Sequence, residues 1–167
     1  MTDLDLVAAR RVRAVLLDAG FTADGLLALL GASAYAALGR GEPVPARRVL
    51  EGRTGADAAL ARLFVLGEAL PRDDAARDLP LDDLAALGLV GGSGEIRALV
   101  DVRPYGEPDT DWYVVSDHGP DSAGRDDGEV AVDHVLGVGG ASLTLARIAP
   151  RTDVVRALDI GTGCGVQ

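Results

Sequence analysis

The chain has 167 residues, of which 48% are hydrophobic, and this is enough for one substantial core or two small ones. Its formal net charge is −10, and all 16 of its basic residues are arginine. The whole acidic excess lies in residues 71–150, which hold six arginines against sixteen acidic residues. Because such a surface repels phosphate backbones, the composition argues against a stand-alone nucleic-acid-binding domain in this stretch.

The sequence carries no sign of export or of membrane insertion. No apolar run reaches the length of a membrane span, and residues 1–5 are acidic where a secretory signal would be basic. Cys164 is the only cysteine, so no disulfide can form within the chain. We therefore expect a cytoplasmic protein of bacterial type that does not associate with membranes.

The first seventy residues have the apolar spacing of helices, punctuated by glycine and proline. Gly20 and Gly31 are stop signals, and Thr22 is a suitable N-cap for the helix between them. The helix expected over residues 56–70 is the strongest of this region, because its apolar residues share one face. The pattern as a whole predicts helices over residues 3–18, 23–30, 32–38, 46–51 and 56–70.

Shorter elements follow, and strands appear among them. The pattern predicts short helices over residues 72–78 and 81–87, and strands over residues 89–90, 95–103 and 111–116. Trp112 and Tyr113 are neighbours on the last of these strands and therefore lie on opposite faces of it. We expect one of the two rings in the core, and the other exposed or covering the start of the next domain.

Three helices followed by a small β-hairpin, as expected over residues 56–103, resemble a winged-helix module. The resemblance implies that the helix over residues 81–87 would read DNA in a DNA-binding relative. We instead expect this module to position a substrate or to contact a protein, and not to bind DNA. The reason is that only Arg72 and Arg77 in this helix and its approach oppose five aspartates, namely Asp73, Asp74, Asp78, Asp82 and Asp83.

The last third of the chain contains a polar loop, a helix and a glycine-rich tail. Residues 118–129 are polar and rich in glycine, which predicts an exposed loop. Residues 141–148 have helical spacing. A linker is therefore expected at residues 117–135, between a domain of residues 1–116 and the beginning of a second domain at residues 136–167.

The functional interpretation depends on the tail. Residues 154–160 form a short, mostly apolar run with several β-branched members, which predicts a buried strand. Asp159 lies near its end, and three alternating glycines follow, Gly161, Gly163 and Gly165. Because glycine has no Cβ and tolerates positive φ, such a loop lets backbone N–H groups approach a ligand closely.

The Asp-x-Gly-x-Gly-x-Gly spacing resembles the first motif of class I S-adenosylmethionine-dependent methyltransferases. The string from Ala157 to Val166 looks like the subgroup that includes the release-factor glutamine methyltransferases and the small-subunit ribosomal RNA guanine methyltransferases. The resemblance implies that Gly161, Gly163 and Gly165 wrap the amino-acid end of S-adenosylmethionine and that Asp159 helps to orient it. It also implies that residues 137–142 lie at an edge of the cofactor or substrate site, and an ordinary packing helix there is the alternative.

Two other interpretations of the tail remain open. A dinucleotide fold uses the fingerprint G-x-G-x-x-G, but Val166 stands where its third glycine would be. A glycine-rich turn after an ordinary strand would need no ligand at all.

We therefore expect a mainly α-helical protein with a small β part, an α+β fold in which a winged-helix-like module precedes the beginning of a Rossmann-like domain. The full-length enzyme would transfer a methyl group from S-adenosylmethionine to a nitrogen of a protein or RNA substrate. The sequence would end just after the first cofactor-binding motif, so the catalytic residues are unknown and this part alone would be inactive. The tail would be displaced, or paired with a second copy in a homodimer. The alternative function is a non-enzymatic winged-helix module for protein interaction.

A few further residues suggest other chemistry. His118 and His134 each follow an aspartate, but neither lies in a helical i, i+4 array, so we interpret both as solvated loop residues and predict no metal site. Cys164 is interpreted as a small residue in a tight turn. Ser116 and Ser142 lack the Gly-x-Ser-x-Gly motif of a hydrolase nucleophile.

Overall fold

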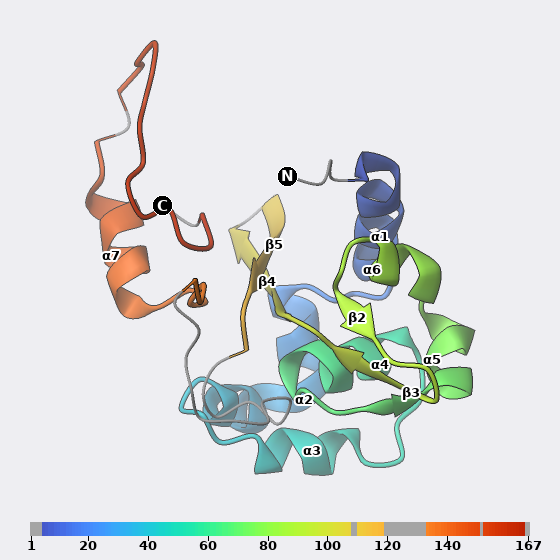
Figure 1. Cartoon of the computed structure of the whole chain (residues 1–167). Coiled ribbons are helices and arrows are strands. Elements are labelled where there is room, and N and C mark those ends of the chain that lie inside the picture. Colours follow the sequence, from blue (N-terminus) through green and yellow to red (C-terminus); the bar gives the residue numbers. More distant parts are fainter. Residues whose placement is uncertain (1–4, 108–109, 119–132, 151, 166–167) are drawn as a thin grey trace.

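The structure is a computed structural model, and it describes residues 5–107, 110–118, 133–150 and 152–165. The described residues form a mixed α+β protein in which helices surround two small antiparallel sheets (Figure 1). The expected α+β class is thereby confirmed. The exposed loop predicted at residues 118–129 lies almost wholly outside the described residues.

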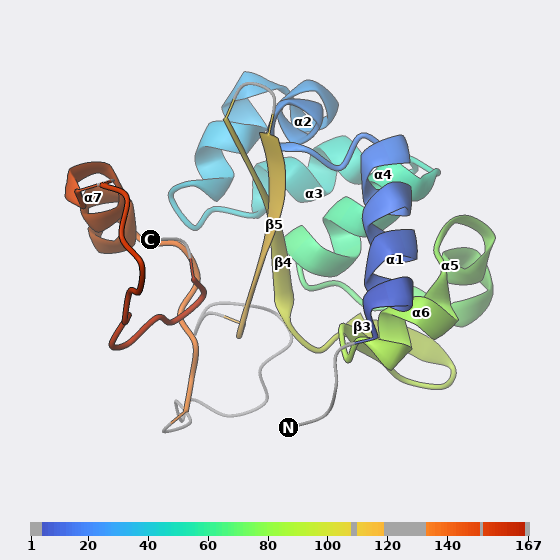
Figure 2. The same ribbon diagram turned by 90° about the horizontal axis from the view of Figure 1, so that it is seen from above.

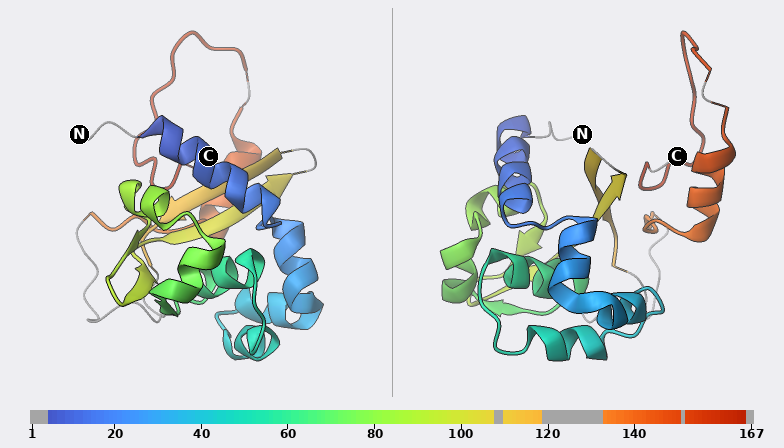
Figure 3. Two further views of the ribbon diagram at one scale, coloured as in Figure 1. Left: turned by 90° about the vertical axis from the view of Figure 1, so that its right-hand side faces the viewer. Right: turned by 180° about the vertical axis from the view of Figure 1, so that it is seen from behind.

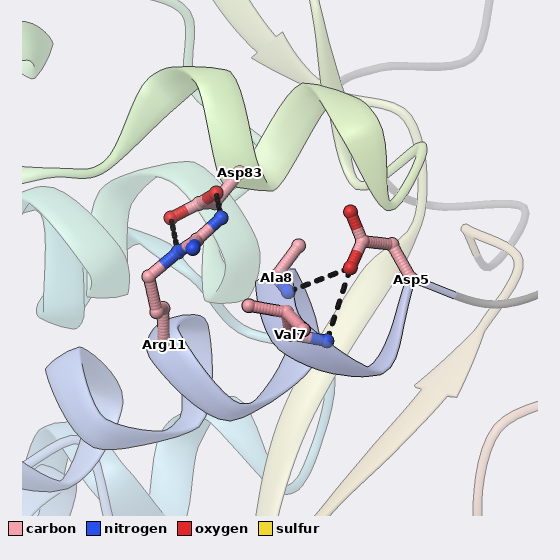
Figure 4. Close-up of polar contacts among 5 residues, drawn as sticks. All are labelled: Asp5, Val7, Ala8, Arg11 and Asp83. Carbon is pink, nitrogen blue, oxygen red and sulfur yellow. Dashed lines mark hydrogen bonds and ion pairs between the residues drawn. The ribbon is translucent and has the colours of Figure 1, made fainter.

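Helix α1 spans Leu6–Asp18 and begins at a strong N-cap. The Asp5 carboxylate accepts hydrogen bonds of 3.0 Å from the backbone N–H groups of both Val7 and Ala8 (Figure 4). These two donors have no partner inside the helix, so the aspartate satisfies groups that the first turn leaves free. The buried face of α1 consists of Ala8, Val12 and Leu16, which follow the helical spacing.

Helix α2 spans Ala23–Leu38 and contains a break. Gly31 adopts φ 76° and ψ 158°, values outside the helical region, so the two helices predicted on either side of it are two segments of one bent element. Thr22 caps the first segment by accepting a 3.0 Å hydrogen bond from the N–H of Gly25. Helix α3, Val44–Leu50, then packs against α2.

The helix predicted over residues 56–70 is shorter than expected. The chain forms α4, Ala56–Leu60, and continues directly into a π-helical turn, η1, Ala61–Val65. The wider turn is visible in the bond from the N–H of Leu66 to the carbonyl of Ala61, five residues earlier. Gly67 then adopts φ 65° and ends the helical run, so Leu70 lies in a strand instead.

A small three-stranded sheet follows, with two helices inserted in it. Strands β1 (Leu70–Pro71), β3 (Glu95–Ala98) and β2 (Val90–Gly91) pair antiparallel in that order. Helices α5 (Arg72–Asp78) and α6 (Leu81–Ala86) connect β1 to β2. These are the short elements that the sequence predicts, with the first strand of the sheet added.

The strand predicted over residues 95–103 is in fact two strands. The N–H of Leu99 bonds to the carbonyl of Leu89 at 2.9 Å, after which the chain leaves the first sheet. It enters a second sheet as β4, Asp101–Glu107, which pairs antiparallel with β5, Thr110–Ser116. The apolar alternation continues through the bend, which is why the sequence pattern shows one strand.

One hydrophobic core joins these elements. Helix α1 lies across one side of the β4–β5 hairpin, and α7 lies on the other side (Figures 2 and 3). Phe21, which follows α1, contacts both Phe64 and Tyr113, with ring centroids 6.5 and 6.4 Å apart. The largest fully buried side chains of the core are Phe21, Phe64, Leu50, Leu60, Leu63, Leu84, Ile96 and Val102.

A bidentate ion pair ties α1 to α6 at the surface of this core. The Arg11 guanidinium donates to both carboxylate oxygens of Asp83, at 2.8 and 2.6 Å (Figure 4). The hydrogen bond from Arg11 lowers the pKa of Asp83, and the same bond raises the pKa of Arg11.

Helix α7, Gly140–Ile148, confirms the helix predicted over residues 141–148, but none of its residues is buried. Among the described residues no single helix is long and apolar enough to cross a membrane. Helices α1 and α2 meet that criterion only as a pair, bent by 42°.

Candidate functional site

The glycine-rich tail extends away from the body of the protein (Figure 1). The buried strand predicted over residues 154–160 is absent from the described tail, which forms bends and turns without strand pairing. Its apolar side chains are exposed: Val155 by 101%, Leu158 by 85% and Ile160 by 88%. The strand prediction was therefore wrong, whereas a displaced tail, one of the two arrangements expected for it, agrees with the structure.

The predicted cofactor-binding residues lie together because they are close in sequence. Gly161, Gly163 and Gly165 adopt φ of 84°, 55° and 74°, all in the left-handed region that other residues rarely occupy. A 2.9 Å bond from the N–H of Gly165 to the carbonyl of Thr162 closes a turn between them. Asp159 is exposed just before this turn.

The glycine loop has open space around it. An added Cβ would meet nothing within 4 Å at Gly161, and only atoms of the loop itself at Gly163 and Gly165. Backbone conformation, and not crowding, is therefore what requires glycine at these three positions. The side of the loop on which these Cβ atoms would lie is therefore open.

Tyr105, in β4, interacts electrostatically with a residue of α7 and with a residue of the glycine loop. Burial raises the pKa of Tyr105. The positive charge of Arg147 in α7 lowers this pKa, and Cys164 in the loop raises it. Tyr105 pairs across the hairpin with Trp112, so the two rings lie on the same face of the sheet. Trp112 is 57% exposed, as expected for one ring of the Trp112–Tyr113 pair.

The two histidines that follow aspartates are held by different partners. The Nε2 of His118 lies 3.1 Å from the carbonyl oxygen of Ala98. The Nδ1 of His134 lies 3.6 Å from an Asp117 carboxylate oxygen, and its side chain is only 8% exposed. The interpretation of His134 as a solvated residue was therefore wrong. No group of three or more metal-ligating side chains occurs in the described part of the chain.

Residues 135–137 run beside the end of β5. The N–H of Asp117 donates to the carbonyl of Val135 at 3.0 Å, and the N–H of Val135 returns a 2.7 Å bond to the Asp117 carboxylate. Gly137 lies against Ser116, and an added Cβ would come within 3.1 Å of the serine Oγ. The segment predicted to form an edge of the cofactor site therefore begins against the end of the hairpin.

On the other side of the hairpin, an open groove lies between α1 and β5. Its volume is about 810 Å³. The walls are mostly apolar, and the groove gathers residues far apart in sequence: Ala9, Val12, Arg13, Leu16, Leu87, Leu89, Val102, Asp111, Trp112, Tyr113 and Val115. The sequence pattern did not predict this groove, although it shows the apolar faces of α1 and β5 that line it.

Tyr113, one of the residues that line the groove, carries a polar group that is itself buried. Its ring stacks on Phe21 with an angle of 4° between the planes. Its hydroxyl is buried and has no hydrogen-bond partner among the described residues. The pKa of Tyr113 is raised to about 12, chiefly by burial and also by the Asp111 carboxylate, whereas Arg13 opposes the shift. The phenol of Tyr113 is therefore neutral, and its hydroxyl is enclosed without a partner among the described residues.

A family model for a domain of unknown function, DUF7059, matches residues 18–102. This is just over half of the chain. The chain belongs to the DUF7059 family. Neither a curated protein nor a solved structure matches it.

The DUF7059 match covers the helical body and the first sheet. It begins at Asp18, the last residue of α1, and ends at Val102, in β4. The glycine loop lies outside it, and so does β5. The groove is therefore built at the border of the matched region, from residues within it and from both flanking segments.

Proposed function

We propose that this chain is the N-terminal part of a class I S-adenosylmethionine-dependent methyltransferase that methylates a nitrogen of a protein or RNA substrate. The observation that carries the proposal is the glycine loop. Its three alternating glycines all adopt positive φ, and the first of them follows an acidic residue, Asp159, by two positions. This conformation leaves backbone N–H groups uncovered by side chains, which suits the close approach of a charged ligand.

The residues present fit one end of such a cofactor. When bound, S-adenosylmethionine supplies a methyl group activated by its sulfonium sulfur. Gly161, Gly163 and Gly165 would hold its amino-acid end through the backbone, and the exposed Asp159 carboxylate would orient it. Since the leaving group is already good, the enzyme would act mainly by aligning the acceptor nitrogen with the methyl carbon.

The exposed apolar side chains of the tail favour the same proposal. Val155, Leu158 and Ile160 are at least 85% exposed, whereas the most exposed large apolar residue of the body, Leu6, is 61% exposed. Patches of this kind mark surfaces that another part of a protein covers. We infer that the remainder of a Rossmann-like methyltransferase domain covers them, and that this chain without it has no methyltransferase activity.

The body would serve substrate recognition as a winged-helix-like module. Its helices and strands follow in the order η1, β1, α5, α6, β2 and β3, with β3 in the centre of the sheet. Helix α6 corresponds to the helix that reads DNA in DNA-binding winged-helix proteins. Its Asp83 accepts hydrogen bonds from Arg11 of the neighbouring α1. An acidic helix packed against another helix favours a scaffold or a protein contact over a DNA contact. We place this function in the cytoplasm.

Titration of S-adenosylmethionine into the natural full-length protein, followed by calorimetry, tests the proposal. The wild-type protein is expected to bind the cofactor, and Asp159→Ala should weaken binding by about tenfold or more, since it removes a charged hydrogen-bond partner. Asp153→Ala is the matched control, because Asp153 is an exposed aspartate of the same tail. Absence of cofactor binding by the wild-type protein would favour the alternative, a non-enzymatic interaction module.

A further inference from the structure

A group of contacts at the end of β5 connects the body of the protein to the segment that leads into α7. The backbone N–H of Asp117 donates to the carbonyl oxygen of Val135 at 3.0 Å, and its Oδ2 accepts a 2.7 Å hydrogen bond from the N–H of Val135. The Nδ1 of His134 lies 3.6 Å from the same carboxylate oxygen. Asp117 therefore holds both backbone groups of Val135, and we call Asp117, His134 and Val135 the clasp.

On the body side, Asp117 is fixed by the residues before and after it. Ser116 is the last residue of β5 and is only 6% exposed. The Nε2 of His118 lies 3.1 Å from the carbonyl oxygen of Ala98, in β3 of the first sheet. Asp117 thus lies between two residues that are each held by one of the two sheets, and it belongs to the packed body.

On its other side, the clasp is followed by elements that bury little surface. No residue of α7 is buried, and Val155 and Ile160 of the tail are exposed. The hydrophobic burial that fixes the helices of the body therefore contributes little to the placement of α7 and the tail. Hydrogen bonds determine where such a segment lies, because they constrain both distance and angle.

Close packing accompanies the polar contacts of the clasp. The His134 side chain is only 8% exposed, although it lies outside the helices and strands. A Cβ added at Gly137 would come within 3.1 Å of the Ser116 Oγ. Glycine therefore allows the backbone to approach the end of β5 closely, just before α7 begins.

We propose that Asp117 is a positioning residue, which fixes α7 and the glycine loop relative to the body through Val135 and His134. In the proposed function, the body recognises the substrate and the glycine loop holds the cofactor. Their relative placement then determines how well the acceptor nitrogen meets the methyl carbon. Only this effect on the rate rests on the proposed function, whereas the effect on geometry does not depend on methyl transfer.

Two substitutions separate the side chain of Asp117 from its backbone. Asp117→Ala removes the acceptor for the N–H of Val135 and keeps the backbone bond to the Val135 carbonyl. Asp117→Asn keeps an acceptor oxygen on a side chain of the same shape. The alanine variant should therefore release the segment, and the asparagine variant should largely retain it.

Distance measurement by electron paramagnetic resonance of the full chain tests the proposal. Spin labels are placed at two exposed positions, Arg10→Cys in α1 and Ile148→Cys in α7, with Cys164→Ser because Cys164 is the only natural cysteine. This labelled protein should give one narrow distance distribution, and adding Asp117→Ala should broaden it at least about twofold. Asp133→Ala, which changes an exposed aspartate next to the clasp, is the matched control and should leave the distribution narrow.

Three results would overturn the proposal. They are a broad distribution in the labelled protein with Asp117 intact, an unchanged distribution in Asp117→Ala, and equal broadening in Asp117→Ala and Asp133→Ala. Circular dichroism of each variant confirms that the body is folded.

A second variant repeats the test without altering the body. Val135→Pro removes the N–H that bonds to the Asp117 carboxylate, so it should broaden the distribution as Asp117→Ala does. Leu136→Pro is its control, because it places the same ring one residue later and keeps the N–H of Val135. Equal distributions in the two proline variants would overturn the proposal.

Kinetics of the natural full-length protein connect this geometry to the rate. Asp117→Ala should lower kcat about tenfold or more, and Asp117→Asn should restore it to within about threefold of the wild type. The dissociation constant for S-adenosylmethionine should stay unchanged, because Asp117 acts through Val135 and not through the cofactor. Absence of activity in the wild-type protein would contradict the proposed function alone, and the distance measurement would still decide the role of Asp117. An unchanged kcat of Asp117→Ala in an active enzyme would overturn its role in turnover.

Discussion

The body of the protein and its glycine-rich tail lie on opposite sides of the β4–β5 hairpin and are organised in opposite ways (Figure 2). In the body, large apolar side chains such as Phe64 and Ile96 are almost fully buried. In the tail, Val155 and Ile160 are exposed, and the conformation is set locally by glycine turns. Tertiary packing therefore defines the body, whereas the tail has a defined loop but no packing of its own.

The largest difference between the two regions should appear when apolar side chains are shortened. Phe64→Ala removes a ring that is 1% exposed and contacts Phe21, and it should lower the free energy of unfolding by about 3–5 kcal/mol. Ile160→Ala in the tail should change it by less than about 0.5 kcal/mol. Urea denaturation followed by circular dichroism measures both values. Similar losses in the two variants would show that the tail is packed after all.

A smaller effect is expected at the start of α1. Asp5→Ala removes the acceptor for two N–H groups and should lower the free energy of unfolding by about 1 kcal/mol. Asp18→Ala, at the other end of the same helix, is the control and should be neutral or slightly stabilising, because a negative charge is unfavourable near a helix C-terminus. Equal losses would indicate a general effect of charge instead of capping.

The buried Tyr113 should make the stability of the body sensitive to high pH. Its pKa of about 12 in the folded protein lies above the ordinary value of 10.0, so the folded state favours the neutral phenol. This contribution is complete below pH 10.0 and is lost as the pH rises towards about 12. Ultraviolet titration of the wild-type protein minus that of Tyr113→Phe isolates the transition. A difference curve centred near the ordinary value would contradict the burial of this hydroxyl.

The smallest effect concerns the ion pair between α1 and α6. The pKa of Asp83 is lowered from 3.8 by the hydrogen bond from Arg11, so the stabilisation is present above that value and is lost as the pH falls through the lower value of the folded state. Both side chains remain in contact with solvent, and the effect should decrease with salt. Thermal denaturation of the wild-type protein and Asp83→Asn between pH 3 and 7 tests this. A melting-temperature difference that persists unchanged at the lowest pH would contradict the ion-pair explanation.

The sequence predicted the elements whose signals are local. Helix α5 has the predicted bounds, and the break at Gly31 was visible as a stop signal. Predictions failed where long-range pairing decides the outcome. The bend at Leu99 arises because β3 and β4 belong to different sheets, and the run at residues 154–160 has no partner strand among the described residues.

The candidate sites differ in the same way. The glycines of the tail were predicted because a single loop carries all of them, and their positive φ values agree with that prediction. The groove could not be predicted, because it requires α1 to lie beside residues about a hundred positions later in the chain.

Hydrogen–deuterium exchange of the natural full-length protein, with and without S-adenosylmethionine, tests the proposed role of the tail most directly. The cofactor should protect the amides of residues 159–165 and leave those of residues 111–115, beside the groove, unchanged. Unchanged exchange at residues 159–165 with saturating cofactor would contradict a methyltransferase function for the glycine loop.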